Sequence, residues 1–289
     1  MKRCGLLLAV LVASLCHSPG QVTVEVTQDQ DQFLPGEALI AAVRITNRSG
    51  QTLNFGSDPG WLTFSVESRD GYVVLKTGEV PVMGEFSLES SKRAIKRVDL
   101  APYFNLAKQG RYSIVANVTI KEWNQQISSA PKLFDIIEGA KLWEQEIGVP
   151  RSNKSTNQAP EVRKYTLQEA NHLRKSLMLY LRLSDSAGKI NKVFPIGPMI
   201  SFGQPDSQVD KSNNLHVLFQ NGPHSFSYLV FNPDAEIVRR QTFDYTTRPH
   251  LQTDNDGHFS VAGGRRRVTS DDVPPPGEAS GTNAPVSGL

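Results

Sequence analysis

LMLYLRLSD (177–185) and SFSYLVFN (225–232) decide the fold of the C-terminal half, because each opens the same series of apolar stretches and turns. The stretches that follow them in the two series are KINKVFP (189–195) with EIVRRQTF (236–243), and NLHVLFQ (214–220) with GHFSVAG (257–263). Short apolar stretches separated by Gly, Pro, Asn and Asp are typical of β-strands joined by tight turns. This half of the chain is therefore predicted to be antiparallel β-structure with an internal repeat.

The repeat has a period of about 44 residues, which is the length of four short strands and their turns. Apolar residues align with apolar residues and turn residues with turn residues in the pairs Tyr180/Tyr228, Pro205/Pro249, Gln208/Gln252, Asp210/Asp254, Leu215/Phe259 and Val217/Val261. Four short strands per repeat is the composition of a β-propeller blade. We therefore predict two blade-like four-stranded units over residues 176–268.

The stretch RPHLQTDNDGHFSV (248–261) resembles the BNR or sialidase-type repeats of secreted bacterial propellers. It keeps the Asp-x-x-Gly turn of that family's Asp-box at Asp254 and Gly257, but it lacks the Trp that follows. Two blades are also too few to close a ring, which takes four to eight. The expected arrangement is two sheets packed face to face or docked on the N-terminal half.

The N-terminal half shows repeated short strands and no window of helical period. VTVEVT (22–27) and WLTFSVES (61–68) alternate apolar and polar residues, and ALIAAVRIT (38–46) ends at a turn that begins with Asn47. Alternation of this kind buries one face of each strand, and six or seven such strands over about 115 residues are typical of a β-sandwich. An all-β fold is predicted, with a sandwich over residues 21–138.

LAKQGRYSIVA (106–116) resembles the entry to the penultimate strand of bacterial Ig-like domains. In that family a Gly turn precedes a Tyr that fixes the corner, and these residues correspond to Gly110 and Tyr112. KLFDII (132–137) would then be the closing strand. The resemblance implies an Ig-like sandwich, a fold that serves many functions and identifies none.

Two further segments complete the predicted organisation. Residues 139–175 form a polar connector, in which Thr166 and Glu169 match a helix capping box while RKYTL (163–167) reads equally well as a strand. The last segment, residues 269–289, is rich in Pro, Gly and Ser without an apolar period, and is predicted to be a disordered tail.

The first twenty residues have the pattern of a secretory signal peptide. Lys2 and Arg3 precede an apolar stretch that is too short to span a bilayer, and Ser18 and Gly20 fit a cleavage before Gln21. We therefore expect a periplasmic or secreted protein without a transmembrane segment in the mature chain. The alternative is a lipoprotein anchored at Cys16, although Leu15 stands where the lipobox has a small residue.

The composition excludes several classes of function for the mature chain. The full chain has 31 Lys and Arg against 29 Asp and Glu, and loss of Lys2 and Arg3 makes the two numbers equal. A balanced chain has no general affinity for nucleic acid or for anionic membranes. The one dense basic cluster, Arg265–Arg267, is expected to keep the edge of a strand soluble. Both cysteines lie in the leader, which excludes thiol catalysis and Cys-based zinc sites.

Few residues suggest chemistry. Asp244, Tyr245 and Arg248 share one interstrand loop and form a weak candidate binding site. Asp254–Gly257 reads as a hairpin turn, because an EF-hand loop in this register lacks its acidic first and last ligands. The clustered histidines (His216, His224, His250 and His258) are not at ligand spacing. We expect no catalytic residue, no metal and no cofactor.

These observations favour a non-catalytic exported binding or structural protein whose partner is a protein or glycan at the cell envelope. The alternative is a glycan-active hydrolase, or an accessory module of one, that uses the blade-like region. Such an enzyme would need two carboxylates, or a Tyr nucleophile beside arginines, around one pocket. A weaker third possibility is a protease-inhibitor-like module, because TNRSGQTLNF (46–55) loosely resembles such inhibitors.

Overall fold

The computed structural model describes residues 22–150, 160–172 and 176–273. Within these ranges the chain is almost entirely β-structure, and the two helical segments are single 3₁₀ turns, η1 (Ala101–Tyr103) and η2 (Lys121–Trp123). None of the described helices has the length and hydropathy needed to cross a bilayer. The predicted leader and the lipidation alternative at Cys16 lie outside the described residues.

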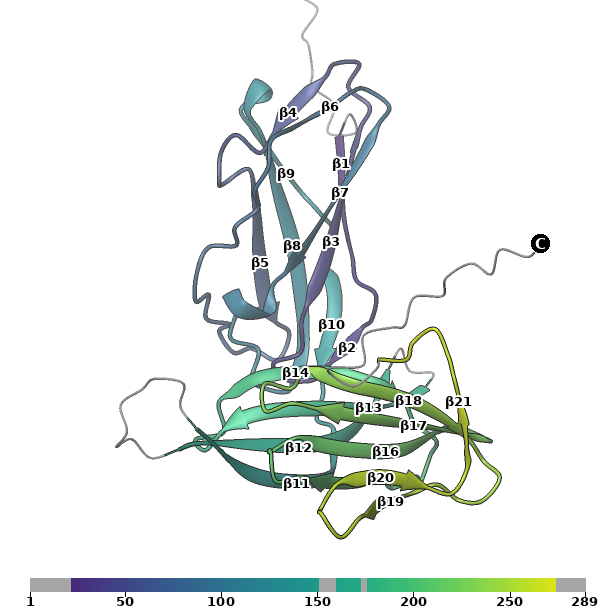
Figure 1. Cartoon of the computed structure of the whole chain (residues 1–289). Helices are drawn as coiled ribbons and strands as arrows, with labels where there is room; N and C mark the ends of the chain where they lie inside the picture. The colour runs from purple at the N-terminus through teal and green to yellow at the C-terminus, as the bar shows by residue number, and fades with distance from the viewer. Residues whose placement is uncertain (1–21, 151–159, 173–175, 274–289) are drawn as a thin grey trace, which may run out of the picture.

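Ten strands form the N-terminal region, which we call the sandwich (Figure 1). They are β1 (Val22–Thr27), β2 (Gln32–Phe33), β3 (Ile40–Asn47), β4 (Leu53–Phe55), β5 (Leu62–Ser68), β6 (Phe86–Leu88), β7 (Arg93–Asp99), β8 (Gly110–Ile120), β9 (Gln125–Ser128) and β10 (Lys132–Ile136).

Two main sheets of the sandwich enclose one core. One has the order β1-β3-β7, and the other has the order β2-β10-β8-β5 with β9 beside β8; a short third sheet pairs β4 with β6. The alternation seen in the sequence sets the buried faces, since Val22, Val24 and Val26 of β1 point inward while Glu25 points outward. These valines join residues of both sheets in a single cluster.

Tyr112, near the start of β8, links that strand to the turn before it and to β10. Its ring is fully buried and stacks on Phe134 of β10, and its hydroxyl donates to the carbonyl of Lys108. Gly110 has a φ of +147° at the start of β8, a conformation that L side chains rarely adopt. Gly110 and Tyr112 therefore both have a structural role at the entry to β8.

Eleven strands form the C-terminal region, which we call the stack. They are β11 (Ala140–Val149), β12 (Glu161–His172), β13 (Ser176–Asp185), β14 (Ile190–Pro198), β15 (Asp206–Val209), β16 (Leu215–Gly222), β17 (Ser225–Phe231), β18 (Ile237–Asp244), β19 (His250–Thr253), β20 (Phe259–Ala262) and β21 (Arg265–Arg267). The sheet orders are β11-β12-β13-β14, β15-β16-β17-β18-β21 and β19-β20. The predicted all-β class with antiparallel four-stranded units is confirmed.

The residues that form each unit differ from the predicted ones. The segment 139–175, predicted as a connector, contributes β11 and β12 to the first sheet, and the competing helix is absent from its described residues. The predicted first unit is split, because β13 and β14 complete the first sheet while β15 and β16 begin the second. The aligned pairs still occupy equivalent strands, so the repeat is present with its boundary shifted by two strands.

Four turns of the stack share one structure, which explains the strongest signal in the repeat. In each, the first residue is Asp or Asn, its side-chain oxygen accepts the backbone N–H of the fifth residue, and the fourth residue has positive φ. Asx side chains commonly close turns in this way. The turns are Asp185–Lys189, Asp210–Asn214, Asn232–Glu236 and Asp254–His258.

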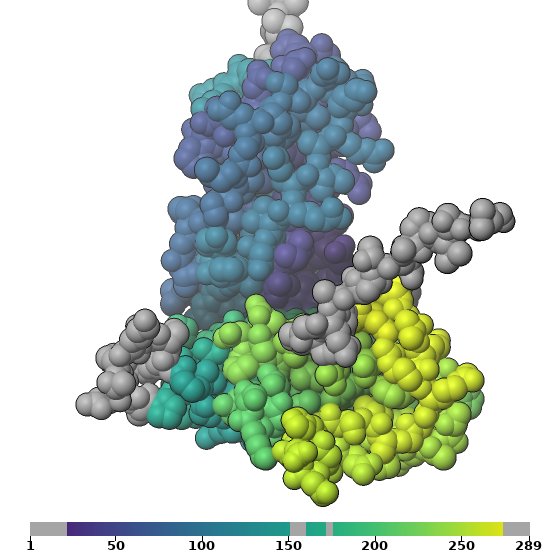
Figure 2. All heavy atoms as spheres, in the orientation of Figure 1, coloured from purple at the N-terminus to yellow at the C-terminus, as the bar shows by residue number. Residues whose placement is uncertain are grey.

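The sheets of the stack pack face to face (Figure 1), and the stack as a whole lies across one end of the sandwich (Figure 2). One cluster, which includes Leu181 and Phe231, joins the first sheet to the second. A second cluster, which includes Tyr228 and Leu251, joins the second sheet to the β19-β20 hairpin. The hairpin exposes His250 and Gln252 on its outer side. A polar outer layer is what terminates a stack of repeated sheets.

The first residues of the segment predicted as a disordered tail, 269–289, are structured. Residues 269–273 form a turn, and Val273 exchanges backbone hydrogen bonds with Arg240 of β18. Asp272 also pairs with Arg266. The tail from 274 onward lies outside the described residues. Arg265–Arg267 forms the edge strand β21, in agreement with the interpretation from sequence.

Candidate functional site

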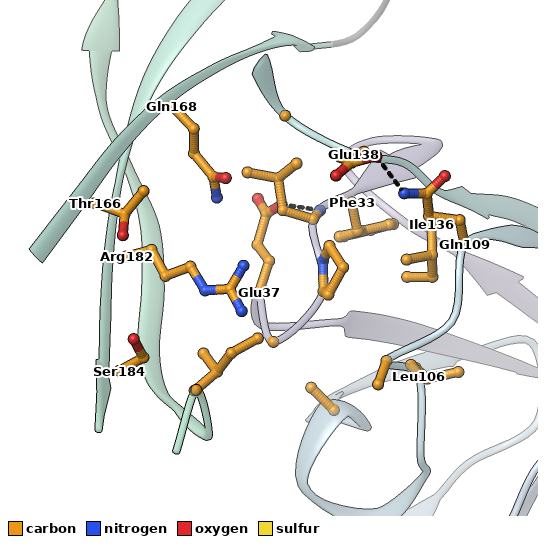
Figure 3. A pocket seen from close by; sticks show the side chains of 18 of the residues that line it. Phe33, Glu37, Leu106, Gln109, Ile136, Glu138, Thr166, Gln168, Arg182 and Ser184 are labelled. Carbon is orange, nitrogen blue, oxygen red and sulfur yellow. Dashed lines mark hydrogen bonds between the residues drawn. The ribbon is translucent and has the colours of Figure 1, made fainter. Parts of the chain in front are cut away.

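A cavity of about 800 Å³ lies between the sandwich and the first sheet of the stack (Figure 3). Its floor is one face of β12 and β13, and its opposite wall is the sandwich, including Phe33, Ile136 and the turn that carries Glu37. Ligand sites occur preferentially as concave spaces at domain junctions. We therefore take this interdomain cavity as the candidate functional site.

Strand alternation produces the polar floor. Tyr165 and Leu167 of β12 point into the core of the stack, so the residues between and beside them point to the cavity. The floor consists of Lys164, Thr166 and Gln168 from β12 with Arg182 and Ser184 from β13. Thr166, Gln168 and Ser184 are more than nine-tenths buried, yet their side chains have no hydrogen-bond partner among the described residues. Buried polar groups of this kind usually have partners.

Arg182 is the central cation of the floor. It is half-buried and extends into the cavity toward the turn of Glu37 (Figure 3), but it forms neither an ion pair nor a side-chain hydrogen bond with any described residue. Of the three lysines in the lining, Lys141 pairs with Glu144 at 2.8 Å, whereas Lys164 and Lys189 add positive charge at the edge of the floor. A guanidinium offers five donors in a fixed fork that matches carboxylate and phosphate oxygens. Arg182 is therefore the residue best placed to bind an anionic group.

Glu37 holds the two regions together beside the cavity. Its carboxylate is buried and accepts hydrogen bonds from the Gln30 amide and the Leu34 N–H, both at 2.8 Å. Its backbone forms a bridge with Val193 of β14. Next to it, Leu34 packs against Tyr180 and other residues of the first sheet. This turn of the sandwich therefore positions the cavity wall.

Burial raises the pKa of Glu37 above its ordinary value of 4.5, although hydrogen bonds from Leu34, Gln30 and Tyr180 oppose the shift. Glu37 therefore holds its proton to a higher pH in the folded state than in the unfolded chain. The stability that this shift contributes is complete below the pKa of the unfolded state and is lost as pH rises through the raised pKa of the folded state. We predict that the stability of the wild type relative to Glu37→Gln falls as pH rises above 4.5. Urea denaturation of both proteins across this range measures it, and a pH-independent difference would contradict it.

The structure separates the residues proposed from sequence. Asp244 pairs with Arg267 at 3.1 Å and with Arg265 at 3.6 Å. Tyr245 is half-exposed and stacks on Phe226, while Arg248 lines a different, smaller cavity. The three residues thus share a loop end but do not line one pocket. They also lie outside the interdomain cavity.

His216 is part of a buried network. Its Nδ1 lies 2.7 Å from the Tyr228 hydroxyl and its Nε2 lies 3.1 Å from Asp210. Burial lowers its pKa, and the neighbouring Asp210 opposes this shift. A satisfied network inside the stack accounts for the histidine without a ligand.

Asp254, Asp256 and His258 place one ligand atom each within 4.8 Å of one another, but all three residues are exposed. The side chain of Asp254 accepts the N–H groups of the other two. The first residue of the equivalent turn at Asp210 does the same for Ser212 and Asn214. The shared turn structure therefore explains this grouping.

The residues of the interdomain cavity were not identified from sequence. Glu37 and Arg182 are far apart in the chain, and only the docking of the two regions brings them to one space. A usable signal was present in LMLYLRLSD (177–185), where Arg182 is the only charge before the final Asp. An isolated charge in an apolar strand calls for a partner or a cavity.

Comparisons with known proteins do not place the chain in a family. No family model matches the sequence, and no curated protein matches it. One solved structure shows a distant similarity: Spo0M, a sporulation control protein from Bacillus subtilis, aligns with 61% of this chain and 89% of its own at 8% identity and a TM-score of 0.30. The resemblances to Ig-like domains and to BNR repeats are not confirmed by these comparisons.

Proposed function

We propose that this chain is a non-catalytic binding protein of the cell envelope and that its interdomain cavity binds an acidic sugar. The observation that carries the proposal is Arg182, a half-buried cation without a partner among the described residues, set among polar side chains that are equally free. The leader predicted from the sequence supports an exported location.

The chemistry of the floor fits a sugar with a carboxylate group. Arg182 can take the carboxylate in a bidentate contact. Thr166 and Ser184 supply hydroxyls and Gln168 supplies an amide, which can donate to and accept from sugar hydroxyls. The opposite wall includes Phe33 and Ile136, which give the apolar contact that a sugar ring also needs.

Calorimetric titration with glucuronate and with glucose tests this proposal. We expect the chain to bind glucuronate more tightly than glucose, and Arg182→Gln to weaken glucuronate binding by about tenfold or more, because a charge-assisted hydrogen bond is lost. Arg182→Lys keeps the charge without the fork and should give an intermediate affinity. Since Arg182 has no partner among the described residues, the thermal stability of Arg182→Gln should be unchanged.

Arg69→Gln is the matched control, because Arg69 is exposed on a turn of the sandwich away from the cavity lining. Its binding of glucuronate should equal that of the wild type. Equal affinities for glucuronate and glucose, or an affinity that does not respond to Arg182→Gln, would contradict the proposal.

The hydrolase alternative has no comparable support among the described residues. It requires Asp244, Tyr245 and Arg248 around one pocket, but Asp244 is ion-paired, Tyr245 stacks on Phe226, and only Arg248 lines a cavity. The proposal therefore assigns binding without turnover to the cavity.

A further inference from the structure

Phe202 combines two unfavourable features. Its side chain is fully exposed, with a relative exposure of 101%, the highest among the exposed large hydrophobic residues described. It also has a φ of +62° in the turn that the Gly203 N–H closes on the Ile200 carbonyl. For a bulky residue this backbone conformation is strained, and glycine would relieve both the strain and the exposure.

Three of the other four non-glycine residues with positive φ among the described residues have local explanations that Phe202 lacks, and the fourth, Ser91, is not a bulky residue. Asn124 and Asn213 are of the type that tolerates this conformation. Ala235 belongs to one of the four shared turns and its side chain is buried. Strained residues persist mainly where they serve a function. Phe202 is therefore an exposed apolar side chain on a strained backbone, and we call it the knob.

A cavity, which we call the hole, lies next to Phe202. This cavity of about 360 Å³ begins at Gly203 and includes Pro205, Leu218, Phe226 and Pro249 as apolar lining. Its walls come from the loops between β14 and β15 and between β18 and β19 and from strands β16 and β17, at the end of the sheets opposite the four shared turns. A benzene ring fits in about 150 Å³, so the hole is large enough for a phenyl side chain, with apolar residues on one part of its wall and polar residues on the rest.

We propose that two copies of this chain form a symmetric dimer in which Phe202 of each copy enters the hole of the other. A twofold contact brings residue i to residue j and residue j to residue i, which requires a surface that is complementary to itself. A knob and a hole on neighbouring loops satisfy this requirement.

The charges around the hole agree with a second copy as the occupant. Asp206 and Arg248 both line it, so its rim carries both signs. Around a twofold axis the acidic side of one rim can meet the basic side of the other, whereas a rim of one sign would repel its copy. The hole and the interdomain cavity have no lining residue in common. The dimer contact therefore uses none of the residues that line the interdomain cavity.

Sedimentation velocity of the purified chain from about 1 to about 500 μM tests the dimer, which we expect in the micromolar range because the contact is small. Phe202→Gly should raise the dissociation constant by about thirtyfold or more, as expected for a central aromatic anchor, while raising the melting temperature of the monomer. The dimer becomes weaker while the monomer becomes more stable, so the loss of dimer cannot be attributed to a loss of folding.

Two further variants sharpen the test. Met83→Ser removes another exposed apolar side chain, on the sandwich, and should leave dimerisation unchanged. Arg248→Glu makes the rim wholly acidic and should weaken the dimer, most strongly at low salt. A chain that stays monomeric to 500 μM, or a dimer that is indifferent to Phe202→Gly, overturns the proposal. The proposal is also overturned if the chain is monomeric and binds phosphatidylcholine vesicles in a way that depends on Phe202, because Phe202 would then contact a membrane.

Discussion

Replacing Tyr165 by alanine should lower the free energy of unfolding of the stack by about 3–5 kcal/mol, the range for a buried aromatic truncated to alanine. Tyr165 is fully buried on β12 and belongs to the core between the first and second sheets. Its hydroxyl lies 2.7 Å from the Asn232 carbonyl and 3.1 Å from the Asn213 carbonyl. These carbonyls belong to two of the four shared turns, so this single side chain links the first sheet to both turns of the second.

Tyr165→Phe separates the two contributions. It keeps the ring and removes only the hydroxyl, which should cost about 1 kcal/mol for a lost hydrogen bond. Urea denaturation monitored by circular dichroism measures both variants. A Tyr165→Phe protein as stable as the wild type would show that the hydroxyl does not link the turns. A loss of less than about 1 kcal/mol in Tyr165→Ala would contradict the packing role.

Strands with a regular alternation of apolar and polar residues were predicted well from the sequence. A strand whose second face lines the polar cavity was predicted poorly. In β12, Tyr165 and Leu167 face a core, but Lys164, Thr166 and Gln168 face the cavity. Such a strand reads as hydrophilic, and Thr166 with Glu169 imitates a helix cap. The connector prediction failed because a strand that lines a polar cavity lacks the composition of a strand that covers a core.

The repeat illustrates a separate limit. Its period follows from residues such as Asp210 and Asp254, which occupy equivalent turns. A period of four strands does not say which strand begins a sheet, since any four consecutive strands give the same spacing. That choice depends on β11 pairing with β12, and the polarity of both strands concealed it.

The candidate site depends on a contact that no local pattern encodes. Pro35 and Gly36 favour a turn at Leu34–Glu37, and Gly36 has a φ of +82°. Its docking on the stack is a tertiary event, in which Leu34 fills an apolar patch formed by Ala170, Tyr180 and Val193. Both the cavity and its wall follow from that docking.

Leu34→Asp should therefore separate the two regions and abolish glucuronate binding. The new carboxylate would be buried in an apolar cluster beside Glu37, and burying an unpaired charge costs several kcal/mol. The sandwich and the stack have separate cores, so we expect both to remain folded.

Small-angle scattering should then show a larger radius of gyration for Leu34→Asp, and calorimetric melting should resolve two transitions. Leu133→Asp is the control, because Leu133 is about half exposed on β10 and can carry a charge in water. Its scattering and its glucuronate affinity should match those of the wild type. If Leu34→Asp kept the wild-type radius of gyration and the wild-type affinity, the turn at Leu34 would not be what holds the cavity closed. The opposite result would show that a contact between the two regions, and not either region by itself, makes the binding site.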